Sequence, residues 1–196
     1  MEKMRDSIDF SSEDIPALYR KVLYPTLLGM LAAVSYTIAD GVFVGQAAQP
    51  IISYNYGLRR TDKTRLALNV SMKTALIYGV VIVLVSLLGA EWVVRMFLKS
   101  SDPAYPLAVS GLRLFSAGFI PFAVNVIAMS YFQSIERARS ATLITVLRSF
   151  VLMGTAFLVL PPILGIKGAW LAVPTSEILT MLVVLLIFRK SPTVKR

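Results

Sequence analysis

The chain has 196 residues, of which 56% are hydrophobic and 16% charged, with a formal net charge of +9. Soluble domains average roughly 45–50% apolar and about 25% charged residues, so this composition excludes an ordinary soluble domain and predicts an integral membrane protein. It contains no cysteine or histidine, which excludes disulfides, thiolate zinc sites and Cys or His nucleophiles. We therefore expect no enzyme, catalytic residue, metal or cofactor.

The N-terminal segment, 1–21, is predicted to lie in the cytoplasm. Glu13 and Asp14 after two serines, with Pro16 in the first turn, predict a short surface helix. The mixture of acidic and basic residues lacks the order of a secretory signal. Arg20 and Lys21 then mark the membrane interface.

An apolar run starts at Val22, and we assign 22–46 to a first transmembrane helix. Asp40 is the one charged residue between Val22 and Arg59. The rest of the chain, 47–190, is predicted to form a transmembrane helical bundle, followed by a cytoplasmic tail, 191–196. About 20 apolar residues span a bilayer, and four stretches of the bundle reach that length: Leu66–Gly89, Ala108–Gln133, Ala141–Ile163 and Gly168–Phe188, the last two joined by a loop at Leu164–Lys167.

Basic clusters set the expected topology. Lys and Arg in short loops mark the cytoplasmic side, and the clusters at 59–65, at 137–139 and at the C-terminus alternate correctly with the four spans. This placement favours membrane topology over nucleic-acid binding as the role of the positive charge. Arg20 and Lys21, however, also require the cytoplasm, and the run after them is too short for the two crossings, roughly 40 residues, that this needs. A re-entrant loop at 46–50 is one solution, and missing sequence near residue 46 is the simpler one.

Several motifs resemble multidrug and toxic compound extrusion (MATE) transporters. Tyr24-Pro25-Thr26 followed by Tyr36 and Asp40–Gly45 is similar to the family's first helix, whereas Ala48–Gly57 resembles the end of its eighth helix and the loop entering its ninth. Further similarities are Tyr131-Phe132-Gln133, Leu147-Arg148 and Gly168-Ala169-Trp170 with Pro174.

The resemblance implies an all-α integral membrane protein with about five transmembrane helices. The family has twelve helices in two six-helix lobes, so this chain would hold helix one, the end of helix eight and helices nine to twelve. Helices two to seven would be absent, and this internal truncation would remove the conflict in the predicted topology.

The same resemblance implies secondary active multidrug efflux in a bacterial cytoplasmic membrane. A proton or sodium gradient would drive export of small hydrophobic or cationic molecules through a cavity between the lobes. One lobe and a single helix cannot enclose such a cavity, so we expect impaired activity. A non-transporting remnant or structural subunit, and a relative that flips lipid-linked sugars, are the alternatives.

Asp40 is the first candidate for ion coupling. A carboxylate in an apolar helix costs roughly 2.5–3.5 kcal/mol on insertion scales, and desolvation favours its protonated form. Tyr36 lies four residues earlier on the same helical face and could hydrogen-bond Asp40. Both positions match the coupling cluster of the family's N-terminal lobe. The structural alternative is that Asp40 reaches the membrane interface.

Polar residues of the later spans are candidates for a substrate pathway. We single out Asn125 and Glu177, although each could instead serve helix packing. Glu177 is expected to pair with a cation or a backbone donor if it faces the bundle interior. Arg113, Arg148 and Lys73 are interpreted as side chains that reach a membrane interface.

Overall fold

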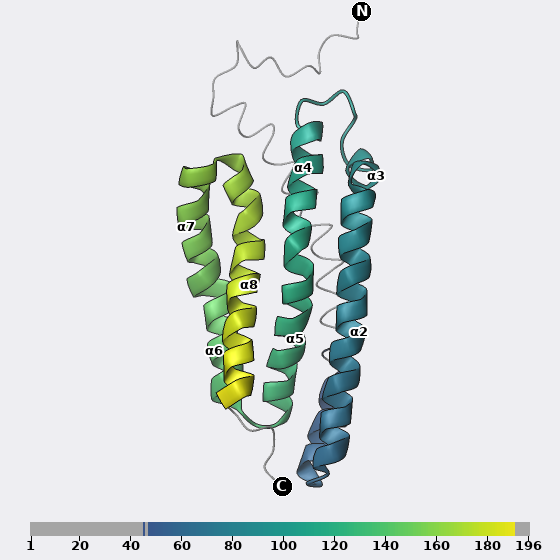
Figure 1. The fold of residues 1–196 in the computed structure, drawn as a ribbon, viewed down its shortest axis with the longest axis vertical. Helices are drawn as coiled ribbons and strands as arrows, with labels where there is room; N and C mark the ends of the chain where they lie inside the picture. Colours follow the sequence, from purple (N-terminus) through teal and green to yellow (C-terminus); the bar gives the residue numbers. More distant parts are fainter. Residues whose placement is uncertain (1–44, 46, 191–196) are drawn as a thin grey trace, which may run out of the picture.

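The computed structural model describes residue 45 and residues 47–190. The predicted N-terminal segment 1–21, nearly all of the predicted first helix 22–46, and the tail 191–196 lie outside the described residues. The predicted bundle, 47–190, lies within them and consists of long helices standing side by side (Figure 1).

The bundle is made of consecutive helices that run up and down. A helix at 47–57 turns through Arg59, which has φ 55°, into the first long helix. The elements that follow are α2 (Thr61–Leu88), α3 (Ala90–Arg95), α4 (Tyr105–Phe115), the 3₁₀ turn η1 (Ser116–Gly118), α5 (Phe119–Ser134), α6 (Ala138–Val146), the π-helical segment η2 (Leu147–Leu152), α7 (Met153–Leu164) and α8 (Ile166–Lys190).

Four helical stretches of the described chain are long and apolar enough to cross a membrane. They are Thr61–Leu88, Tyr105–Ser134, Ala138–Leu164 and Ile166–Arg189. These confirm the four predicted spans, each a few residues longer than its apolar core because the polar residues at the interfaces continue the helix. The predicted loop at Leu164–Lys167 is wrong in length. Gly165 alone joins α7 to α8, since its φ of 61° is readily adopted by glycine.

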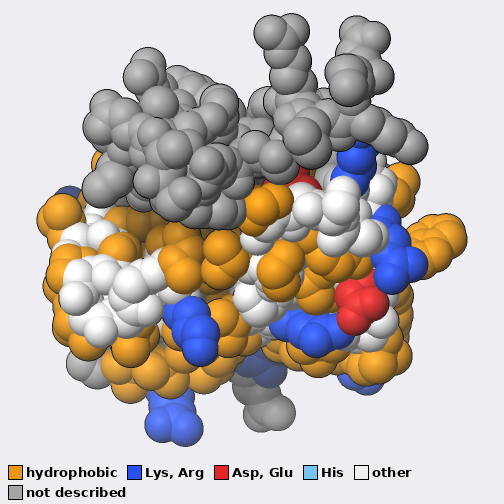
Figure 2. Space-filling model, turned by 90° about the horizontal axis from the view of Figure 1, so that it is seen from above, with side chains coloured by type: hydrophobic (Ala, Val, Ile, Leu, Met, Phe, Trp, Pro, Cys, Tyr) orange, Lys and Arg blue, Asp and Glu red, His pale blue; other side chains and the backbone are white. Residues whose placement is uncertain are grey.

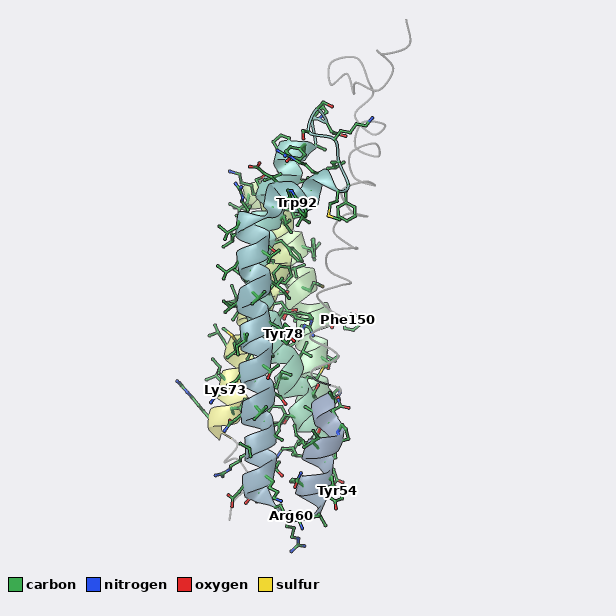
Figure 3. All side chains as sticks on the ribbon, turned by 90° about the vertical axis from the view of Figure 1, so that its right-hand side faces the viewer. Tyr54, Arg60, Lys73, Tyr78, Trp92 and Phe150 are labelled. Carbon is green, nitrogen blue, oxygen red and sulfur yellow. The ribbon has the colours of Figure 1, made fainter. Side chains whose placement is uncertain are left out.

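The core of the bundle lies where α2, α5, α6 and α8 meet. Tyr131 and Phe132 of α5 are 1% exposed, and both rings contact Phe188 of α8. Helix α7 packs along α8, and α2 packs along α5. The outer faces of α2 and of the α6–η2–α7 column carry exposed apolar side chains, including Tyr78 and Phe150 (Figure 3). Apolar side chains also cover most of the described perimeter seen from the α3 end (Figure 2). Such a surface suits lipid as its solvent.

Close helix contacts at two glycines fix the upper half of the bundle. A Cβ at Gly111 would overlap the indole ring of Trp170, and one at Gly118 would lie 3.1 Å from the Cα of Pro174. Helix α4, η1 and α8 therefore approach each other closely, and this places the start of α5 directly against the middle of α8.

Hydroxyl groups within the spans satisfy themselves locally. They donate to a carbonyl three or four residues earlier in the same helix, as Ser71, Ser116, Ser134, Thr145, Ser176 and Thr180 do. This back-bonding is the usual solution where no water is available. The polar groups that bond between helices are therefore the ones that need a functional explanation.

Candidate functional site

Glu177 is a buried carboxylate at the middle of α8. It lies eleven residues after Ile166, about 17 Å along the helix, and the residue is 2% exposed. Its two carboxylate oxygens accept hydrogen bonds from different helices, Oε1 from the Arg148 Nε at 2.6 Å and Oε2 from the Asn125 Nδ2 at 2.8 Å. A buried charge needs such partners, because desolvation otherwise costs more than a single contact returns.

Arg148 supplies the compensating positive charge from η2. Its side chain is 20% exposed, and the guanidinium carbon lies 4.6 Å above the centroid of the Phe122 ring of α5. The interpretation of Arg148 as a side chain that reaches the membrane interface is wrong. The residue sits ten positions into the Ala138–Leu164 span, and its guanidinium bonds across to α8 instead.

Asn125 ties the third helix to the pair. Its Nδ2 donates both to the carboxylate of Glu177 and to the Glu177 backbone carbonyl, the latter at 2.9 Å. The side chain is fully buried. Within the described part of the chain, the Asn125 Oδ1 has no hydrogen-bond partner. The cluster of Asn125, Arg148 and Glu177, with the Phe122 ring, is called the intramembrane cluster below.

The helices that carry the intramembrane cluster are irregular where they meet. Arg148 is the second residue of the π-helical segment η2, Pro174 lies inside α8 three residues before Glu177, and η1 with Pro121 precedes Asn125. Phe150, two residues beyond Arg148, lies near mid-height of the bundle (Figure 3). Irregular turns of this kind are common at functional sites.

The other candidate residues lie elsewhere. Asp40 and Tyr36, the predicted coupling pair, are outside the described residues. Gln133 is exposed near the end of α5, where its Oε1 accepts a hydrogen bond from Gln49 at 3.0 Å. Arg113 lies in α4 with its guanidinium 3.6 Å from Glu91, and both side chains are about half exposed. Lys73 is exposed on α2 (Figure 3).

No group of three or more acidic, His or Cys side chains that could hold a metal ion occurs among residue 45 and residues 47–190. The chemistry that the intramembrane cluster can perform is recognition through charge, hydrogen bonds and an aromatic face. It offers one carboxylate, one guanidinium, one amide and one ring.

Comparison with known proteins places this arrangement in a family. The family model MatE matches residues 26–158, which is more than half of the chain. The chain belongs to the MatE family. No curated protein gave a significant match in a sequence search.

Solved structures show the fold shared by the MatE chain. The multidrug transporter DinF-BH, solved in complex with the dye rhodamine 6G, is 21% identical with a TM-score of 0.78, covering 85% of this chain and 37% of its own. A multidrug resistance MATE family transporter in an outward-facing conformation is 19% identical with a TM-score of 0.77, at 84% and 37% coverage. A MOP superfamily transporter from Pyrococcus furiosus is 17% identical with a TM-score of 0.76, at 84% and 37% coverage.

The chain thus spans little more than a third of the length of these structures. This is consistent with the predicted truncation, because a twelve-helix relative is far longer than the 196 residues present. The matches also confirm an all-helical membrane architecture of the MATE type.

Proposed function

We propose that this chain takes part in secondary active multidrug efflux, as a proton or sodium antiporter of hydrophobic or cationic compounds across the cytoplasmic membrane. Its MatE membership supports the proposal. The observation that carries it is the intramembrane cluster, because ionisable residues within a span are costly and are expected to serve function.

Each candidate residue has a role in this proposal. Asp40, assisted by Tyr36, exchanges the coupling ion in the N-terminal part. Asn125 and Glu177 belong to the substrate pathway, since their polar groups converge between α5 and α8 rather than bonding within one helix. A carboxylate is the group expected to attract a cationic compound.

The test is export of the fluorescent cationic dye rhodamine 6G from bacterial cells that lack their own efflux pumps. Cells expressing the chain should retain less dye than cells with empty vector, and dissipating the ion gradient should remove the difference. The Asp40→Asn variant should export no better than the vector, because an amide cannot cycle between charged and neutral forms. Equal retention by all strains, at matched expression in the membrane, would refute efflux.

A second candidate function is that of a membrane component without transport of its own. The coverage of 37% of the solved transporters favours it, because alternating access needs two bodies that move against each other. Purified protein that binds rhodamine 6G but moves none into liposomes under a proton or sodium gradient would support this function.

A further inference from the structure

We propose that the intramembrane cluster is a binding site for an organic cation that carries N–H groups, and that the guanidinium of Arg148 occupies this site as a tethered competitor. The identity of the ligand as a transported compound rests on the proposed function. The competition by Arg148 concerns binding alone.

The contacts of Arg148 define what the site recognises. The guanidinium donates to the carboxylate of Glu177 at 2.6 Å and lies over the Phe122 ring at 4.6 Å. A carboxylate combined with an aromatic face is the pairing by which proteins bind cationic ligands. A free cation entering here would make the same two contacts that the guanidinium makes now.

Asn125 adds an acceptor that the guanidinium leaves unused. Its Oδ1 is buried without a partner among the described residues, and its Nδ2 already bonds to Glu177. A buried acceptor left unpaired is costly. A ligand with two N–H groups could donate to this oxygen and to the carboxylate together. A bare metal ion would bring no apolar group to the Phe122 ring, so the site fits an organic cation better.

Charge balance makes the exchange physically feasible. Glu177 is one carboxylate, and Arg148 neutralises it at mid-depth in the bilayer. An additional cation would leave a net positive charge in a poorly solvated position, whereas replacing the guanidinium by a ligand cation keeps the pair neutral. The ligand and Arg148 are therefore expected to compete rather than to bind together.

The π-helical segment gives Arg148 a route out of the site. A π turn holds one more residue than an α turn. A return of η2 to α-helical bonding would rotate one end of the column against the other by about 100°, the angle per residue of an α-helix. Because Arg148 lies at the start of η2, this rotation would carry its guanidinium away from Glu177.

The experiment measures binding of rhodamine 6G to the purified full-length chain in detergent micelles by fluorescence anisotropy. In Arg148→Gln the competitor is removed, so the Kd should fall about tenfold if Arg148 fills the site nine-tenths of the time. Glu177→Gln should abolish saturable binding. Arg113→Gln, which removes an equal charge outside the cluster, should bind like the unaltered chain.

An unchanged or higher Kd in folded Arg148→Gln would show that the ion pair is only structural and would overturn the proposal. Absence of binding by every variant would also overturn it. Because the chain has no cysteine, a second measurement covers the case in which Arg148→Gln does not fold. Ser149→Cys, exposed within η2, should change its maleimide labelling rate at least threefold (about the smallest change a shift of η2 should cause) when rhodamine 6G binds.

A neutral dye of similar size should leave that labelling rate unchanged. A rate that does not respond to rhodamine 6G would overturn the proposal, since Arg148 would then not have moved. Binding is measured without a membrane gradient, so a tighter Arg148→Gln variant in a chain that transports nothing would uphold this inference while refuting the proposed efflux.

Discussion

The carboxylate of Glu177 holds three helices together, and its removal should be expensive. Glu177→Ala would leave the guanidinium of Arg148 without its partner at mid-membrane, so we expect unfolding in SDS–detergent mixtures to become easier by about 3–5 kcal/mol. Glu91→Ala is the control. It breaks two ion pairs at 3.6 and 3.7 Å whose side chains are about half exposed, and it should cost about 1 kcal/mol or less. Equal losses in the two variants would contradict a structural role for the buried pair.

Residue identities predicted one half of the ion pair and missed the other. Glu177 stood out because a carboxylate in an apolar span needs a partner, and its pairing with a cation was one of the expected solutions. Arg148 was misplaced because distance from a helix end, counted along the sequence, suggests access to the interface. The direction in which a side chain points depends on the π-helical segment, which apolar periodicity does not reveal. Asn125 could be proposed as polar and inward, but not matched to its partner.

At the scale of elements, the contact between α7 and α8 depends on a glycine. A Cβ at Gly168 would overlap the carbonyl of Leu160 and the backbone nitrogen of Pro161. Backbone atoms cannot rotate away, so Gly168→Ala should destabilise the hairpin by about 1–3 kcal/mol, measured by the same SDS titration. Gly154→Ala, where a Cβ meets nothing within 4 Å, should instead stabilise by about 0.5–1 kcal/mol through helix propensity. If both variants behaved alike, the close contact would not limit the stability.

Helix existence was predictable here, whereas helix breaks were not. A run of about 20 apolar residues identifies a span because backbone groups in lipid must bond internally, and all four spans of the described bundle were found this way. Proline is a poor guide to the irregular turns, because Pro161 and Pro162 stay inside α7. The π segment has neither proline nor glycine in Leu147–Leu152, so no residue type announced it.

For the whole molecule, the basic loops predict which end faces the cytoplasm. Arg60 lies at the end of the bundle opposite Trp92 (Figure 3). In intact cells, a membrane-impermeant maleimide should label Lys99→Cys in the loop after α3, but label Arg139→Cys only after permeabilisation. The cysteine-free chain makes each label unique, and a chain without substitutions serves as the blank. Labelling of both positions from outside would refute a single orientation.

The π-helical segment also bears on how the gene can change. A π turn amounts to one extra residue accommodated within an α-helix, so removing one codon between those for Leu147 and Leu152 would give a continuous α-helix with no backbone bond left open. Apolar lipid-facing positions would tolerate the rotation, since most of this face is exposed. Arg148 would no longer meet Glu177. A deletion that barely disturbs folding would thus create a lineage with a free carboxylate in its membrane interior.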